Sequence, residues 1–235
     1  MPSITDPIFW TGVHPAVWQA DALAGTSGRV LATGDQRLDA ELPGGGWPLG
    51  ALSEILQPTG VHSEWRLLLP ALARSGTGAV VLVGAPQVPF GPALFAQGLT
   101  PGRLLWITAQ LGAQRLWAAE QALRCADVDA VLAWLVQVRP EQLRRLQIAA
   151  AEYAKLLFVV RPEQAQHESS PAALRLWIGP VNDPPDALEV RPFKRRGPPL
   201  DQPLHLSARS AQLRRLLAAS QPGFGHALDC TAAHA

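Results

Sequence analysis

The segment Gln57-Pro58-Thr59-Gly60-Val61-His62-Ser63-Glu64-Trp65 has the setting of a phosphate-binding loop but lacks the groups that bind phosphate. An apolar run, residues 51–56, precedes it, and a helix-like stretch, residues 64–74, follows it. Such loops hold phosphates with glycine backbone N–H groups, a lysine on the outer phosphates and a Ser or Thr hydroxyl on magnesium. The sequence therefore predicts a strand, a loop and a helix, in that order.

The side chains that a triphosphate needs are replaced. Ser63 stands at the lysine position, and Glu64 stands at the hydroxyl position, where its carboxylate would repel a triphosphate. The chain has only two lysines, Lys155 and Lys194, and neither follows a glycine. Arg66 is close by, but it lies a turn into the predicted helix and its guanidinium has a different shape from an ammonium group. We therefore expect no nucleotide cofactor at this loop.

The predicted strand ends give a second test for hydrolysis. Magnesium and an attacking water need an acidic side chain at the carboxyl end of a central strand. The candidate positions carry Gln110 and Trp134. Gln110 is no base at neutral pH, and Trp134 offers only an indole N–H donor. Because the lysine, the hydroxyl and the carboxylates are all missing, we expect no catalytic residues and a protein that is not an enzyme.

Short apolar runs alternate with helix-like segments along most of the chain. The runs cover residues 51–56, 79–83, 103–108, 130–135 and 155–160, and the clearest helices cover residues 114–126 and 141–153. This alternation predicts an α/β fold with a mostly parallel central sheet and helices on both faces. Residues 173–178 and 188–193 predict two further strands, which form a hairpin appended to the sheet.

The chain divides into three parts on this reading. Residues 1–30 form an N-terminal arm with a helix, residues 31–193 form the core with its hairpin, and residues 194–235 form a linker, an amphipathic helix and a mobile tail. In that last helix Leu213, Leu216 and Leu217 make an apolar stripe. The stripe can pack on the chain's own sheet or dock on a partner, and the sequence leaves both open.

Charge gives no strong partner signal. The formal net charge is +1 and the charged fraction is 17%, so any contact with nucleic acid must be local. Lys194, Arg195 and Arg196 are a candidate contact with a DNA backbone, and a solvated loop is the alternative. The run 44–46, three glycines, is either an anion cradle or a tight turn, and we favour the turn.

Histidine and cysteine do not predict a metal site. His226, Cys230 and His234 recur at every fourth residue, as zinc ligands on a helix would, but nearby glycines oppose a helix and a fourth ligand is missing. The chain has two cysteines without the spacing of a disulfide framework, and we expect Cys125 to pack within a helix. With no leader-like start and no apolar stretch near the ~18 residues of a membrane span, we expect a cytoplasmic protein.

Several separated segments resemble the ATPase core of RecA-type recombinases. They include Leu31-Ala32-Thr33-Gly34-Asp35-Gln36-Arg37-Leu38-Asp39, the stretch from Leu42 through Gly50, Leu116-Trp117-Ala118-Ala119-Glu120 and Glu168-Ser169-Ser170-Pro171. Within that group the chain resembles most closely the ImuA family of bacterial damage-induced mutagenesis cassettes, over roughly residues 33–178. The resemblance implies a RecA-like core whose nucleotide loop is degenerate, with Gln110 at the catalytic-glutamate position and Trp134 near the strand aspartate.

The resemblance also implies partners and a role. ImuA proteins act in translesion synthesis under the SOS response, together with ImuB, a Y-family polymerase relative without activity, and an error-prone C-family polymerase. We therefore expect a non-catalytic scaffold that binds an ImuB-type protein, with RecA as a further candidate partner and DNA contact weak or indirect. Two alternatives stay open: a cell-division inhibitor like SulA, another RecA-like relative without the phosphate loop, and an atypical DNA-stimulated ATPase.

Overall fold

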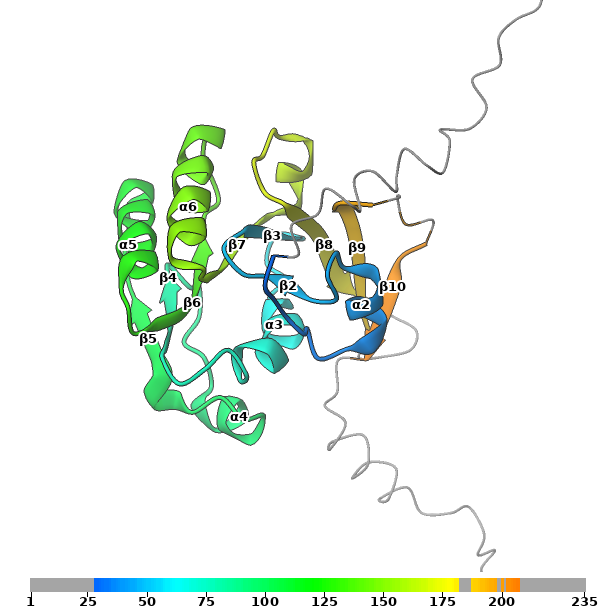
Figure 1. Ribbon diagram of the computed structural model, residues 1–235, viewed down its shortest axis with the longest axis horizontal. Helices are drawn as coiled ribbons and strands as arrows, with labels where there is room; N and C mark the ends of the chain where they lie inside the picture. Colours follow the sequence, from blue (N-terminus) through cyan, green and yellow to red (C-terminus); the bar gives the residue numbers. More distant parts are fainter. Residues whose placement is uncertain (1–27, 182–186, 198–199, 201, 208–235) are drawn as a thin grey trace, which may run out of the picture.

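A computed structural model describes residues 28–181, 187–197, 200 and 202–207 of the chain. Its centre is an eight-stranded sheet of order β10-β9-β8-β3-β7-β6-β4-β5 (Figure 1). The strands that form it are β3 (Leu52–Gln57), β4 (Ala79–Val83), β5 (Leu104–Ile107), β6 (Val128–Trp134), β7 (Leu156–Pro162), β8 (Leu174–Pro180), β9 (Ala187–Lys194) and β10 (Leu204–Ser207). The predicted α/β class and mostly parallel sheet are confirmed.

The parallel and antiparallel parts of the sheet come from different parts of the chain. Strands β8, β3, β7, β6, β4 and β5 run parallel to one another. Each of the five apolar runs supplies one of these strands. β3, β4, β6 and β7 are buried on both faces and so need apolar residues at nearly every position, whereas β5 lies at the edge and is partly exposed. The predicted hairpin is confirmed as β8 and β9, which pair antiparallel. Residues 204–207, assigned from sequence to a linker, instead form β10 and pair with β9.

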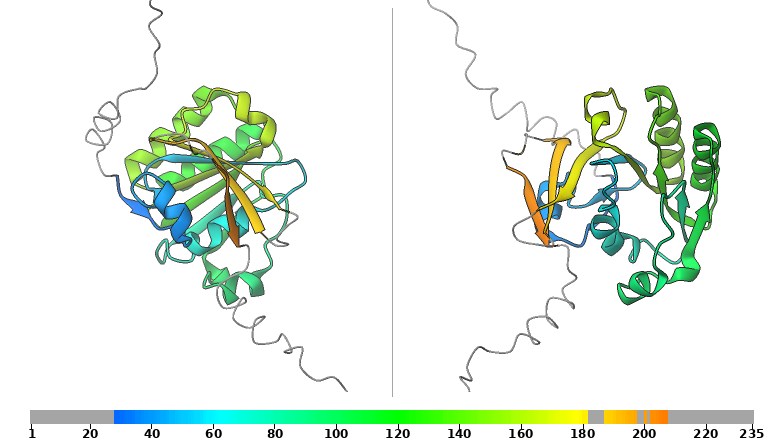
Figure 2. Two further views of the ribbon diagram at one scale, coloured as in Figure 1. Left: turned by 90° about the vertical axis from the view of Figure 1, so that its right-hand side faces the viewer. Right: turned by 180° about the vertical axis from the view of Figure 1, so that it is seen from behind.

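Helices cover both faces of the sheet (Figure 2). α5 (Gly112–Arg124) and α6 (Pro140–Tyr153) bury their apolar stripes against one face. α3 (Glu64–Leu72), the short α2 (Gln36–Glu41) and the two-stranded sheet of β1 (Val30–Leu31) and β2 (Trp47–Pro48) contribute to the core on the other. The remaining described elements are α4 (Gly91–Ala96) and the 3-10 turns η1 (Pro101–Arg103) and η2 (Glu163–His167).

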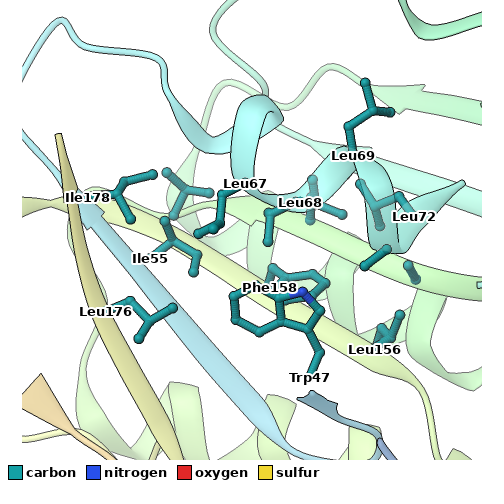
Figure 3. Packing of buried hydrophobic residues seen from close by; sticks show 14 of the residues in the cluster. Trp47, Ile55, Leu67, Leu68, Leu69, Leu72, Leu156, Phe158, Leu176 and Ile178 are labelled. Carbon is teal, nitrogen blue, oxygen red and sulfur yellow. The ribbon is translucent and has the colours of Figure 1, made fainter. Parts of the chain in front are cut away.

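The core on the α3 side is built around two aromatic rings. Trp47 and Phe158 are fully buried and meet edge to face, with ring centroids 5.2 Å apart (Figure 3). Leu67, Leu68 and Leu72 of α3 belong to the same core cluster. The packing therefore fixes the first helix after β3, and with it the loop at residues 58–63, to the centre of the sheet.

Two local predictions need correction or extension. The helix predicted at 114–126 begins and ends two residues earlier, so Cys125 is the residue after its end and its side chain is exposed rather than packed. The glycine run is a tight turn, as favoured: Gly44 and Gly45 have φ of 80° and 84°, in the left-handed region that glycine adopts readily. That turn leads into β2, not into the first strand of the central sheet. Among the described helices, none is long and apolar enough to cross a membrane.

Replacing Asp35 with Ala should lower the free energy of unfolding by about 1 kcal/mol at neutral pH, because Asp35 is the N-cap of α2. Its carboxylate accepts a hydrogen bond from the Arg37 backbone N–H at 2.9 Å. Partial burial acts to raise the pKa of Asp35, but hydrogen bonds and charge from Arg37 outweigh it and hold the pKa below its ordinary 3.8. A lowered folded-state pKa gives stability that is present above the unfolded pKa and lost as pH falls through the folded one. Urea unfolding should therefore show the difference between wild type and variant at pH 7 and a smaller one near pH 3. Glu152→Ala, at an exposed position on α6, is the control and should change stability by less than about 0.5 kcal/mol.

Candidate functional site

A pocket of about 490 Å³ lies at the carboxyl ends of the parallel strands. Its walls come from the loop after β3, the loops after β4 and β5, and the ends of β6 and β7. In parallel α/β sheets this edge is where ligands bind, because the strand-to-helix loops converge there. The predicted loop residues 57–62 and the two positions Gln110 and Trp134 all line this pocket, so the structure brings the candidate site residues together.

A buried hydrogen-bond network connects the two ends of the loop after β3. Glu64, the first residue of α3, is 1% exposed. The Gln57 side-chain amide donates to one of its carboxylate oxygens at 2.8 Å, and the Trp134 indole N–H donates to the other at 3.3 Å. The backbone N–H of Ser63 donates to the Gln57 side-chain oxygen at 3.0 Å. The three side chains therefore join the end of β3, the start of α3 and the end of β6.

This network gives Glu64 a structural role at the start of α3. At the N-terminus of a helix the unpaired N–H groups and the helix dipole favour a negative group, which in a phosphate-binding loop is the phosphate. Here the negative group is the buried carboxylate of Glu64. Sequence reasoning described Glu64 only as a charge that repels triphosphate. It missed that the side chain is a structural acceptor for Gln57 and Trp134.

The pocket wall is basic and carries no acid. Within the part of the chain that the structure describes, the lining includes Arg115, Arg161 and His62 but neither Asp nor Glu. Gln110 is exposed and Trp134 is almost fully buried, and both line the pocket. The two positions expected to be acidic in a hydrolase therefore lie at the pocket as an amide and an indole.

A second buried network lies on the other face of the sheet, and sequence analysis did not find it. Glu54 of β3 is fully buried between the arginines of the neighbouring strands. Arg161 of β7 donates to one of its oxygens at 3.2 Å, and Arg175 of β8 donates to the other. Arg161 also pairs with Glu168 at 2.6 Å, and Arg175 donates to the backbone carbonyl of Ala165 in η2 at 2.7 Å. The network ties the three strands and η2 together.

The basic cluster at the end of β9 is partly occupied by contacts within the chain. The Lys194 ammonium donates to the Ser170 carbonyl at 2.7 Å, and Arg195 pairs with Glu41 at 3.4 Å. Arg196 is exposed. The DNA contact inferred for this cluster therefore stays a prediction, and Lys194 and Arg196 are its exposed residues.

Other candidate residues lie outside the described residues. These are the apolar stripe Leu213, Leu216 and Leu217 and the spaced residues His226, Cys230 and His234. The N-terminal arm before residue 28 lies outside them as well.

No family model matches the chain. It is similar to proteins named ImuA from two strains of Caulobacter vibrioides, at 28% identity over 182 residues, which cover 69% of this chain and 74% of the relative. It is also similar to the cell division inhibitor SulA of Photorhabdus laumondii, at 30% identity over 112 residues, which cover 47% of this chain and 63% of the relative. The resemblance to ImuA inferred from sequence motifs is thus confirmed, and the similarity to SulA covers a shorter part of both chains.

Proposed function

We propose that this chain is an ImuA-type accessory protein of damage-induced mutagenesis, a non-catalytic scaffold with a RecA-like core that binds an ImuB-type polymerase relative. The similarity to the two ImuA proteins over about seven-tenths of the chain supports the role. The parallel sheet with its loop and helix after β3 supports the RecA-like core. We place the protein in the cytoplasm, where such a complex would meet damaged DNA.

The single observation that carries the non-catalytic part is the Glu64 carboxylate at the start of α3. It lies where a triphosphate and magnesium would need positive and hydroxyl groups, and its two oxygens are held by Gln57 and Trp134. A bound triphosphate would add several negative charges beside this buried carboxylate, which is unfavourable in a site of low dielectric constant. With no lysine in the lining, nothing offsets that repulsion in the manner of a phosphate-binding loop.

The partner proposal follows from the family. An ImuB-type protein is the direct partner, and through it the scaffold reaches an error-prone C-family polymerase, with RecA as a further member of the complex. The net charge of +1 suits a protein that contacts DNA weakly or through its partners.

Co-purification tests the partner proposal. The full chain carrying an affinity tag should retain an ImuB-type protein co-expressed from the same genome, and should not retain an active Y-family polymerase from that genome. Deleting the gene should lower the frequency of damage-induced mutations to that of a strain without the ImuB-type protein. Failure to retain the ImuB-type protein, or an unchanged mutation frequency after the deletion, would contradict the proposal.

Phosphate release tests the non-catalytic part. The full chain with ATP, magnesium and single-stranded DNA should release phosphate at the rate of a buffer control. Phosphate release that disappears on changing Gln110 or Arg115 would instead identify an atypical DNA-stimulated ATPase.

The similarity to SulA favours one second candidate, a cell-division inhibitor. Overexpression distinguishes the two. An inhibitor of division would make cells grow as filaments and would block assembly of the tubulin-like division protein in a purified mixture. An accessory protein of mutagenesis would leave both unchanged.

A further inference from the structure

Arg115 brings a positive charge to the pocket that the described part of the chain does not neutralise. Its Nε donates to the Ala109 carbonyl at 2.8 Å and its Nη1 donates to the Trp134 carbonyl at 3.2 Å. Both acceptors are neutral, and no described carboxylate lies within ion-pair distance of the guanidinium. Its Nη2 makes no hydrogen bond to the described residues. Two hydrogen bonds thus hold the Arg115 guanidinium in place, and its Nη2 can still donate to a ligand.

The end of β4 is shaped to receive this guanidinium. Gly84, which also lines the pocket, has φ of 68°, and a Cβ atom at that position would lie 2.6 Å from Nε of Arg115. A larger residue would displace the side chain from the pocket. The arginine is therefore held by two carbonyls and by a glycine that leaves it space, which is the arrangement of a preorganised anion-binding group.

The neighbouring wall adds polar groups beside Arg115. Arg161 lines the same pocket, but it is 2% exposed and its guanidinium already pairs with Glu54 and Glu168, so Arg115 is the described lining arginine without an acidic partner. Thr59, Thr108 and Gln110 add polar groups, and none of the described lining residues is acidic. A ligand that carries a single carboxylate would find donors here and no acidic side chain among the described lining residues, and it would add much less negative charge beside Glu64 than a triphosphate.

The mouth of the pocket is apolar. Val136 is 62% exposed and Trp106 is 39% exposed, and both line the pocket. Leu105 and Leu111 are also largely exposed but do not line the pocket, and Leu105, next to Trp106 on β5, points to the opposite face of the sheet. Strand β5 is the last strand of the sheet on this side, so one side of its backbone faces outward (Figure 1). Exposed apolar groups that surround fixed polar donors mark surfaces that bind other proteins.

We propose that this pocket binds an acidic peptide segment of a partner protein, whose carboxylate pairs with Arg115 while an adjacent apolar side chain lies on Trp106 and Val136. Charge complementarity selects the acidic segment, and the exposed apolar rim selects a peptide over a free anion. The buried Glu64 and the absence of lysine from the lining oppose a triphosphate in the same space. The inference rests on the proposed function, because it gives the scaffold a site at which a partner is held.

A randomised library of short peptides, panned against the immobilised full chain, tests the proposal. The selected peptides should share an Asp or Glu next to a Leu, Phe or Trp. A selected peptide, made with a fluorescent label, should bind Arg115→Gln at least about tenfold more weakly, because a charge-assisted hydrogen bond is lost. The same peptide with its Asp or Glu replaced by Asn or Gln should bind the unchanged protein more weakly by a similar factor. A selection without acidic residues would overturn the proposal.

The matched control is Arg124→Gln, an exposed arginine of the same helix that pairs with Glu120 and lies outside the pocket lining. It makes the same change in net charge and should leave peptide binding unchanged. If Arg115→Gln does not fold, Val136→Glu replaces it: an added carboxylate at this exposed rim position should weaken binding about tenfold, while Val136→Gln should not. Equal effects of pocket and control variants would contradict the proposal.

Competition separates the other occupants. Magnesium–ATP or inorganic phosphate that displaces the peptide at similar concentrations would make the pocket a phosphate site, and self-association lost in Arg115→Gln would make the occupant a second copy of this chain. Either result would overturn the peptide proposal. If the ImuB-type protein still co-purifies with Arg115→Gln, this inference fails and the proposed function stands. If the peptide binds but no ImuB-type protein co-purifies, the proposed function fails and the site remains.

Discussion

Replacing Glu54 with Gln lowers the free energy of unfolding by about 3–5 kcal/mol, the largest effect that we expect from a single substitution in this chain. Glu54 is fully buried, and both of its oxygens accept hydrogen bonds from arginines that are themselves almost fully buried. The amide keeps the shape of the side chain but not its charge. The amide oxygen can still accept from one arginine, but no buried negative charge remains, so Arg161 keeps only the partly exposed Glu168 as an acidic partner and Arg175 keeps none. Urea unfolding followed by circular dichroism measures the change.

An exposed ion pair provides the control for Glu54. Arg145 of α6 pairs with Glu120 of α5 at 2.6 Å, but the arginine side chain is 70% exposed. Arg145→Gln should therefore cost less than about 1 kcal/mol. If Glu54→Gln costs no more than this control, the buried network does not hold the three strands together and the assignment is wrong.

Replacing Glu64 with Ala should lower the free energy of unfolding by about 2–4 kcal/mol, because two buried donors lose their acceptor. The Gln57 amide and the Trp134 indole would both be left unsatisfied behind the pocket. Glu64→Gln should cost less, since its amide oxygen can still accept one of the two hydrogen bonds. Chemical unfolding gives the energies, and hydrogen exchange at residues 57–64 should show faster opening of the loop in Glu64→Ala.

Glu163 offers a matched comparison for Glu64. Its carboxylate also accepts from an indole N–H, that of Trp177, at 2.9 Å, but the pair is only partly buried. Water can replace the lost acceptor there, so Glu163→Ala should cost about 1 kcal/mol or less. Similar costs for the two variants would show that burial does not set the importance of the Glu64 network.

The parallel part of the fold could be predicted from sequence because its signal is local. A strand such as β4, Ala79–Val83, is apolar at every position, and α6 begins at Pro140, which is typical of the first turn of a helix. The antiparallel edge strand β10 gave no such signal, although the β8–β9 hairpin beside it did. Strand β10 has four residues, follows a proline-rich stretch and includes a histidine, so only its pairing with β9 identifies it.

The sequence predicted where the candidate site residues lie, but it did not predict the hydrogen-bond and ion-pair partners of the buried acids. The order of elements placed the loop, Gln110 and Trp134 at one edge of the sheet, because the carboxyl ends of parallel strands meet there. The partners of the buried acids are distant in sequence: Trp134 is 70 residues from Glu64, and Arg161 and Arg175 are 107 and 121 residues from Glu54. A buried charge is recognised by its partners, and a single sequence does not show which residues will meet.

The Glu64 network has a consequence for the folding equilibrium in the cell. A loop that is completed by a bound nucleotide gains stability with the logarithm of the nucleotide concentration, so its folded fraction follows the nucleotide pool. In this chain the negative group at the start of α3 is covalently part of the protein and is present at a fixed ratio of one per molecule. On the proposal that this loop binds no nucleotide, we expect it to be complete as soon as β3, α3 and β6 have assembled, and its stability should not change with the nucleotide concentration.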